Sequence, residues 1–408
     1  MVVLDRARIV TETGIINDGH IAVEGETIVA VEANGPGAAP PRLAAEAVDL
    51  AGHWVLPGFV DLHNHGGGGG SYATGDPESA LRAYRFHRKR GTTTSIASLV
   101  TASVDDLARD VAALAELVDD GVLAGLHLEG PFISQARCGA HDPHLLRAPD
   151  LPVLRSLLRA GRGAVRMVTL APELEGGITA VRHLAESGVT AAVGHTDAAY
   201  HTARDAFAAG ATVATHLFNA MRPIHHREPG PITAALEHDG VIVELINDGV
   251  HLHDAVVRAV FGAVGAERVA LITDAISAAG LPDGSFRLGP MRVRVSAGVA
   301  RLASSDAIAG STLTQDAALR RAVLDEGLSI VDVSAALSAT PARVLGLDGE
   351  IGTVRPGKRA DLVVLDADLA VVGVMARGRW ITRFTGNGHA GAGGNGHRAR
   401  TPPATESA

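Results

Sequence analysis

Residues 58–69 read GFVDLHNHGGGG, a short apolar run that ends in two histidines and a series of glycines. Seven further runs of the buried-strand type follow, and longer stretches rich in Ala, Leu and Arg separate them. They are TTTSIASL (92–99), LAGLHLEG (123–130), VRMVTLAP (165–172), VTAAVGH (189–195), ATVATHLF (211–218), VIVELIN (241–247) and VALITDA (269–275). Strands that alternate with helices form parallel sheets, and eight strands close a barrel. We therefore predict an α/β fold with a (β/α)8 barrel of the TIM type.

The two ends of the chain have a different character from the barrel region. Residues 1–56 and 350–385 are short alternating runs that are broken by Gly, Pro and Asp, and they lack a helical period. This pattern predicts a small β-sandwich domain built from both termini, with the barrel between them at 57–349. A segment near 284–303 predicts a hairpin inserted after the eighth strand. Residues 386–408 are rich in Gly, Ala and Pro, so we expect a disordered tail there.

The composition excludes several classes of partner. The chain has 408 residues, of which 46% are hydrophobic, and a net charge of −9 without a basic run. Binding to nucleic acid needs clustered Lys and Arg, so we expect no nucleic-acid partner. No run approaches the roughly 18 apolar residues that a membrane span requires, and the first residues do not resemble a signal peptide. With Cys138 as its single cysteine, the protein is expected to be cytoplasmic and free of internal disulfides.

Five of the predicted strands end in residues that bind metals. These residues are His63 and His65 after the first strand, Glu129 after the third, His195 after the fifth, His216 after the sixth and Asp274 after the eighth. A single histidine at a strand end is commonly bonded to backbone, but the carboxyl ends of barrel strands meet at one rim. Five such ends therefore favour a site for one or two divalent metal ions per subunit. Imidazole and carboxylate ligands suit zinc best, with iron, manganese or cobalt as alternatives, over calcium or magnesium.

Such a site indicates hydrolysis. A bound divalent metal lowers the pKa of its water towards about 7 and polarises a carbonyl group. We expect Asp274 to take the proton from that water and to return it to the leaving nitrogen, because an amine leaves poorly unless it is protonated. The residues thus predict a metal-dependent amide hydrolase with Asp274 as general base and then general acid.

The motifs DLHNHG, HLEGPF, GHTDA, THLFNAM, REPG, NDGVHL, TDAISAAG and AGSTLT occur in this order between Leu56 and Asp366. In order and spacing they resemble the N-acetylglucosamine-6-phosphate deacetylases of the amidohydrolase superfamily. The resemblance implies hydrolysis of the acetamide of N-acetylglucosamine 6-phosphate to glucosamine 6-phosphate and acetate. It places the principal metal site on Glu129, His195 and His216, and a second site on His63 and His65 with Glu129 and Asp274.

The resemblance also implies a set of substrate-binding residues. They are Ala140, Asn219, Ala220, Arg227, Asp248, Gly249, Val250, His251, Ile308, Ala309 and Gly310. A guanidinium and an imidazole can donate several hydrogen bonds to phosphate oxygens. In the family that the motifs resemble, the phosphate-binding Arg and His are often supplied across a dimer interface. We therefore expect a homodimer, with Arg227 and His251 as candidates for such a contribution.

Two other functions stay open at this point. The first is another amidohydrolase that acts on a different amide or a cyclic amide. Many such enzymes use a carboxylated lysine from a barrel strand, but the two lysines of this chain, Lys89 and Lys358, lie outside the predicted barrel strands. The second is a catalytically silent barrel that serves as a binding module, and such a barrel would be expected to lose ligands or the general base.

Overall fold

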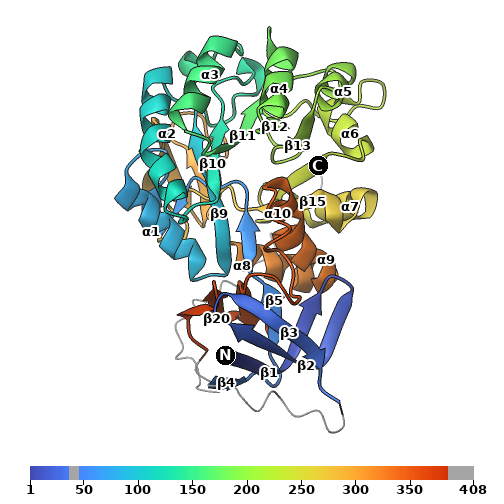
Figure 1. The fold of residues 1–408 in the computed structure, drawn as a ribbon. Coiled ribbons are helices and arrows are strands. Elements are labelled where there is room, and N and C mark those ends of the chain that lie inside the picture. The colour runs from blue at the N-terminus through green and yellow to red at the C-terminus, as the bar shows by residue number, and fades with distance from the viewer. Residues whose placement is uncertain (36–45, 385–408) are drawn as a thin grey trace, which may run out of the picture.

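The computed structural model describes residues 1–35 and 46–384. The predicted tail at 386–408 lies outside these residues. Eight parallel strands form one sheet in chain order (Figure 1), which confirms the predicted barrel. They are β6 (Phe59–Asp61), β9 (Thr92–Val100), β10 (Gly125–Glu129), β11 (Val165–Leu170), β12 (Thr190–Val193), β13 (Ala211–Ala214), β14 (Ile242–Ile246) and β15 (Val269–Ile272).

Each barrel strand is followed by a helix that covers the outside of the sheet (Figure 1). The first seven helices are α1 (Pro77–Arg88), α2 (Val104–Asp119), α3 (Leu151–Ala160), α4 (Gly177–Glu186), α5 (Tyr200–Ala208), α6 (Gly230–Glu237) and α7 (Asp254–Val264). Helix α1 begins with a side-chain cap, in which the Asp76 carboxylate accepts hydrogen bonds from the backbone N–H groups of Glu78 and Ser79. Alanine, valine and leucine side chains fill the space between helices and strands.

Polar side chains, together with backbone bonds at the rim, join the first and the last barrel strand. The Gln315 amide donates to the carbonyl oxygens of Val60 in β6 (3.3 Å) and Leu271 in β15 (3.1 Å). The Asp61 carboxylate accepts from the backbone N–H (3.2 Å) and the hydroxyl (2.6 Å) of Thr273. At the carboxyl ends of the two strands, the Asp274 N–H donates to the His63 carbonyl oxygen at 2.8 Å. These contacts close the barrel directly beneath the candidate site.

Three strands lie between β15 and the eighth helix. β16 (Gly284–Leu288), β17 (Met291–Ser296) and β18 (Val299–Leu302) form an antiparallel sheet of three strands. The sequence predicts a hairpin here, and the third strand extends it because Val299–Leu302 alternates buried and half-buried side chains in register with β17. The chain then returns to the barrel as α8 (Gln315–Arg320). This helix places Gln315 between the first and the last barrel strand.

Both ends of the chain build a second sheet below the barrel (Figure 1). Its strands are β1 (Val2–Thr11), β2 (Gly14–Glu24), β3 (Thr27–Ala33), β4 (Glu46–Asp49), β5 (Trp54–Pro57), β19 (Leu362–Leu365), β20 (Val371–Ala376) and β21 (Arg379–Thr382). β5 joins the two ends, because it pairs in parallel with β1 and antiparallel with β19. Helices α9 (Ile330–Ser334) and α10 (Thr340–Val344) contact β1 and β6 respectively, so they lie between this sheet and the barrel.

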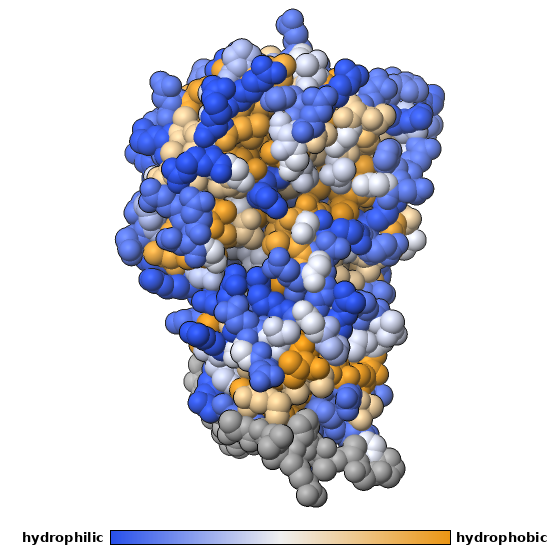
Figure 2. Space-filling view, in the orientation of Figure 1, coloured by the Kyte–Doolittle hydropathy of each residue, from blue (hydrophilic) through white to orange (hydrophobic). Residues whose placement is uncertain are grey.

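The surface is of mixed character. In the view of Figure 2, hydrophilic side chains lie along the outline of the barrel, and hydrophobic ones are visible between them. Within the ranges 1–35 and 46–384, every helix is too short or too polar to cross a lipid bilayer.

Candidate metal centre

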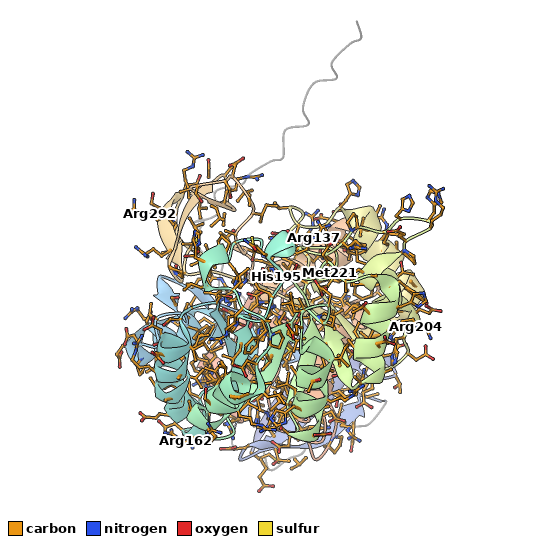
Figure 3. All side chains as sticks on the ribbon, turned by 90° about the horizontal axis from the view of Figure 1, so that it is seen from above. Arg137, Arg162, His195, Arg204, Met221 and Arg292 are labelled. Carbon is orange, nitrogen blue, oxygen red and sulfur yellow. The ribbon has the colours of Figure 1, made fainter. Side chains whose placement is uncertain are left out.

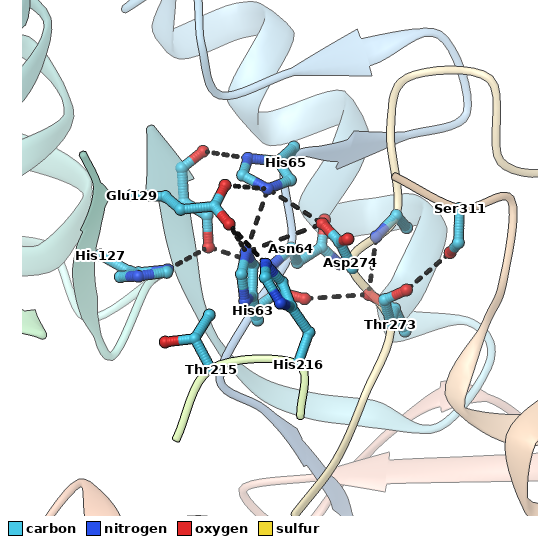
Figure 4. Close-up of polar contacts among 12 residues, drawn as sticks. His63, Asn64, His65, His127, Glu129, Thr215, His216, Thr273, Asp274 and Ser311 are labelled. Atoms are coloured by element: carbon cyan, nitrogen blue, oxygen red, sulfur yellow. Dashed lines mark hydrogen bonds and ion pairs between the residues drawn. The ribbon is translucent and has the colours of Figure 1, made fainter. Parts of the chain in front are cut away.

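The Glu129 carboxylate lies at the centre of the strand-end residues (Figure 4). Its Oε1 atom lies 3.1 Å from Nε2 of His195 and 3.0 Å from Nε2 of His216. Its Oε2 atom lies 3.3 Å from Nε2 of His65. Glu129 is the last residue of β10. His195 and His216, whose Nε2 atoms lie nearest to its carboxylate, follow β12 and β13. Residues that lie as many as 87 positions from Glu129 in the chain therefore meet at its carboxylate.

His63, His65 and Asp274 form the other half of the cluster. Oδ1 of Asp274 lies 3.0 Å from Nε2 of His65 and 3.6 Å from Nε2 of His63. The two histidine Nε2 atoms are 3.1 Å apart, and the His63 Nε2 atom is also 3.4 Å from Oε1 of Glu129. All six predicted metal-binding residues thus lie in one continuous cluster, with Glu129 in contact with both halves, and Figure 4 shows this cluster apart from His195.

Hydrogen bonds fix the orientation of several rings. The Nδ1 atom of His65 lies 3.1 Å from the Ser98 carbonyl oxygen, and that of His195 lies 2.9 Å from the Arg137 carbonyl oxygen. A carbonyl oxygen only accepts, so each Nδ1 atom carries a proton, and in the neutral form of either ring the lone pair is on the Nε2 atom that faces the cluster.

This arrangement fits a metal ion. In the neutral form of His65 and His195, the Nε2 lone pairs would face the oxygens of Glu129, and a cation between these atoms would remove their mutual repulsion. Two nitrogen ligands about 2.1 Å from a tetrahedral ion lie about 3.4 Å apart. The 3.1 Å between the Nε2 atoms of His195 and His216, and of His63 and His65, is close to that spacing. The donor set of imidazoles and carboxylates is the set that zinc and other transition metals prefer.

Three of these residues have an unusual backbone conformation. His195, His216 and Asp274 have φ angles of 47°, 27° and 48°. Residues other than glycine rarely adopt this left-handed region, and such strain is concentrated at functional sites. The strain ends β12, β13 and β15 sharply and turns the three side chains into the barrel mouth. In Figure 3, His195 lies close to Arg137 and Met221.

Burial and neighbouring charges set the protonation of the cluster. Burial raises the pKa of Asp274, but the charges of His63 and His65 outweigh it and lower the pKa to about 2. Burial lowers the pKa of His65, but hydrogen bonds to Asp274 and Glu129 raise it to about 9. The same balance lowers the pKa of the Glu129 carboxyl well below its ordinary value. Both carboxylates are therefore ionised at neutral pH, as metal ligands and general bases must be.

The sequence did not single out His141, although it reaches the same cluster. Its Nε2 atom lies 3.4 Å from Oε2 of Glu129, and burial lowers its pKa to about 4, so the ring is neutral. The backbone N–H of Thr101 lies 3.3 Å from its Nδ1 atom. A backbone N–H only donates, so the Nε2 atom of His141 carries the ring proton. His141 lies in the loop after β10, one residue after the predicted substrate residue Ala140, and that position was the available signal.

Part of the predicted substrate set lines a cavity beside the cluster. The lining includes His65, Glu129, His141, His195, His216 and Asp274 together with Ala140, Asn219, Ala220, His251, Ile308 and Gly310. The imidazole of His251 reaches this cavity from its own chain, and its Nδ1 atom lies 2.7 Å from Oδ2 of Asp248. Metal-binding and sugar-binding candidates therefore face one space.

The remaining predicted substrate residues lie outside the lining of this cavity. Asp248, Gly249 and Val250 form the turn that carries His251, and Ala309 is buried beside Gly310. Arg227 is exposed, and its guanidinium lies 2.8 Å from Nε2 of the neighbouring His226. The described chain thus brings His251, but not Arg227, to its own cavity.

Comparisons with known proteins agree on one family. The model of the amidohydrolase family matches residues 54–383. An N-acetylgalactosamine-6-phosphate deacetylase of Escherichia coli O157:H7 is 34% identical over 381 residues, which cover 92% of this chain and 98% of that protein. An N-acetylglucosamine-6-phosphate deacetylase of Bacillus subtilis is 36% identical over 91% of this chain and 94% of that protein.

A solved structure is still more similar. It is an aspartate-to-alanine mutant of N-acetyl-D-glucosamine-6-phosphate deacetylase from Mycobacterium smegmatis, in complex with N-acetyl-D-glucosamine-6-phosphate. It is 46% identical to this chain with a TM-score of 0.89, and the match covers 94% of this chain and 99% of that one.

Proposed function

Because the chain belongs to the amidohydrolase family, we propose that it hydrolyses the acetamide of N-acetylglucosamine 6-phosphate to glucosamine 6-phosphate and acetate. The observation that carries this proposal is the convergence of four histidine Nε2 atoms and two carboxylates at the mouth of the barrel. That cluster lies on the wall of the cavity into which His251 projects. The chain therefore combines a centre for amide hydrolysis with a group suited to a sugar phosphate.

We propose that Glu129, His195 and His216 hold one divalent metal ion and that His63, His65, Asp274 and Glu129 hold a second. Zinc is our first choice because its usual ligands are imidazole and carboxylate. When bound, such an ion activates water at neutral pH and polarises a carbonyl group. Asp274 accepts the proton of the attacking water and then donates it to the leaving nitrogen. The Nε2–H group of His141 is placed to donate to the carbonyl oxygen of the acetamide.

The 6-phosphate is bound by His251 of the same chain and by Arg227 of a second subunit in a homodimer. The exposure of Arg227 outside its own cavity supports this division. Two hydrophobic side chains near these residues, Ile224 and Val250, are 51% and 40% exposed, and an interface between subunits would bury them. We also propose that the enzyme acts in the cytoplasm, because its substrate is a phosphorylated metabolite.

The direct test is an assay of acetate release with and without a chelator. The substrates are N-acetylglucosamine 6-phosphate, its unphosphorylated form and N-acetylgalactosamine 6-phosphate, which the name of the Escherichia coli relative makes the second candidate. Dihydroorotate serves as the probe for a cyclic amidohydrolase, with ring opening as the readout. We expect acetate from the phosphorylated N-acetylglucosamine, and only with metal. Ring opening alone would favour the cyclic amidohydrolase, and a metal-replete protein that is inert on every substrate would favour a binding module.

A further inference from the structure

Glu244 is a buried carboxylate that has no part in the function proposed above. It is the central residue of β14, and none of its surface is exposed. Its side chain points into the barrel, directly below the histidines of the metal centre. A buried charge without compensation costs several kcal/mol, so its presence there requires a physical reason.

The Oε2 atom of Glu244 contacts both halves of the centre. It lies 3.2 Å from Nδ1 of His63, and it accepts a hydrogen bond of 3.2 Å from the backbone N–H of His216. The backbone carbonyl oxygen of Glu244 accepts a further bond from the Leu217 N–H at 2.8 Å. Glu244 therefore orients the ring of His63, a ligand of the proposed second metal site. It also fixes the strained turn that presents His216, a ligand of the proposed first site.

The contact with His63 decides which ring nitrogen faces the cluster. A carboxylate only accepts, so Nδ1 of His63 carries a proton, and the neutral ring that would bind a metal ion has its lone pair on Nε2. That Nε2 atom is the one near His65, Glu129 and Asp274. The His127 ring packs against the same imidazole in a T-shaped arrangement, with 4.6 Å between the ring centroids.

The second oxygen of the Glu244 carboxylate, Oε1, also indicates that this side chain acts beside a bound cation. Within the part of the chain that the structure describes, Oε1 of Glu244 has no hydrogen-bond partner. A carboxylate that served only to fill the barrel would be better replaced by an apolar side chain. A metal ion held by the neighbouring cluster would supply the positive charge that compensates for this burial.

We propose that Glu244 is a positioning residue that commits His63 to binding the second metal ion through Nε2 and so sets the affinity of that ion. This inference rests on the metal centre of the proposed function. Carboxylates that accept a hydrogen bond from a metal-binding histidine typically change metal affinity about 10–100-fold.

The test is a zinc titration of the wild-type protein and of Glu244→Gln by equilibrium dialysis, with zinc and protein measured in each sample. The amide is isosteric but removes the charge, so we expect the second zinc ion to bind about 10–100-fold more weakly while the first stays bound. Glu326→Gln is the matched control, because Glu326 is also buried in the barrel region, at 5% exposure, and contacts Asn247 rather than a cluster histidine. It should bind two ions with wild-type affinity.

The outcomes separate this inference from the proposed function. If the wild-type protein binds two ions and Glu244→Gln binds both equally tightly, the role of Glu244 is overturned and the metal centre stands. If the wild-type protein binds a single ion at every zinc concentration, the second site fails and this inference fails with it.

A measurement on the wild-type protein does not depend on the folding of the variant. Protein with 15N-labelled histidine is loaded with 113Cd, and the couplings between cadmium and ring nitrogens are recorded. For His63, we expect a coupling between cadmium and Nε2, and a proton on Nδ1. A cadmium coupling to Nδ1 of His63 would overturn the proposal.

Discussion

Asp274 has the charge that a general base needs, because its neighbours keep it ionised. The charges of His63 and His65, with the hydrogen bond from His65, outweigh burial and lower the pKa of Asp274 to about 2, and a metal ion bound by these histidines would supply positive charge in their place. The pH dependence of activity at neutral pH therefore does not arise from protonation of Asp274. We expect it to arise from the ionisation of the activated water, whose pKa is about 7 in such sites.

Replacing Asp274 tests its role in proton transfer. Asp274→Asn keeps the shape of the side chain but cannot accept and return a proton, so kcat should fall by about 10²–10⁴-fold or more. The other ligands should retain metal, because Glu129, His195 and His216 are unchanged. The measurement is kcat together with the metal content of the same sample. Wild-type kcat in the metal-loaded variant would remove Asp274 from the mechanism.

The protonation of His251 predicts a pH dependence of substrate binding. Burial lowers its pKa, but the hydrogen bond and charge of Asp248 outweigh burial and raise the pKa above 6.5. The ring is thus charged below that raised pKa and becomes neutral as the pH rises through it. KM for the phosphorylated sugar should therefore increase over this pH range.

His251→Asn is the matching variant. It removes the titrating group, so its KM should be higher than that of the wild type at pH 6.5 and should vary less between pH 6.5 and 9. If the wild-type KM is constant over this range, His251 does not bind the phosphate as a cation.

At the scale of the element, the carboxyl ends of the strands explain why the sequence predicts much of the site. Eight apolar runs with helical stretches between them indicate a barrel, and a barrel places the ends of its strands at one rim. The positions of His63, Glu129 and Asp274 at strand ends were therefore sufficient to predict that these residues lie close together.

Two other residues escaped prediction for a physical reason. His141 lies in a loop, twelve positions beyond Glu129, and no periodicity places a loop residue in space. Glu244 occupies the middle of an apolar strand, where a polar residue more often faces away from the core. Only the folded arrangement of β14 beside β13 brings its carboxylate to His63 and His216.

The closure of the barrel by Gln315 gives a prediction about stability. Gln315→Ala removes both hydrogen bonds between the amide and the carbonyl oxygens of Val60 and Leu271. Leaving buried carbonyl groups unpaired costs about 1–3 kcal/mol each, so the free energy of unfolding should fall by at least about 1 kcal/mol. Urea denaturation measures this change, and Gln135→Ala in an exposed turn is the control. Equal stability of the two variants would mean that Gln315 does not support the closure.

At the scale of the whole molecule, the proposed dimer predicts complementation between inactive subunits. A homodimer of Asp274→Asn lacks the base in both sites, and one of Arg227→Gln lacks the phosphate ligand in both. A mixed dimer restores one complete site, in the Arg227→Gln subunit, if Arg227 acts across the interface. After unfolding and refolding of an equal mixture, about a quarter of wild-type activity should return, because random pairing makes half of the dimers mixed.

The control for this experiment is each variant refolded alone. A mixture no more active than the mean of the two variants would show that Arg227 serves its own subunit or has no role. The sequence could not decide between these arrangements, because subunit pairing depends on surface shape, to which residues such as Ile224 and Val250 contribute only after folding.

The most direct test of the account is anomalous diffraction at the zinc absorption edge from crystals of protein supplied with zinc. We expect two anomalous peaks at the mouth of the barrel. One lies among Glu129, His195 and His216, and the other lies among His63, His65 and Asp274. Peaks that lie elsewhere, with none among these side chains, would contradict a metal-dependent hydrolase built on this cluster.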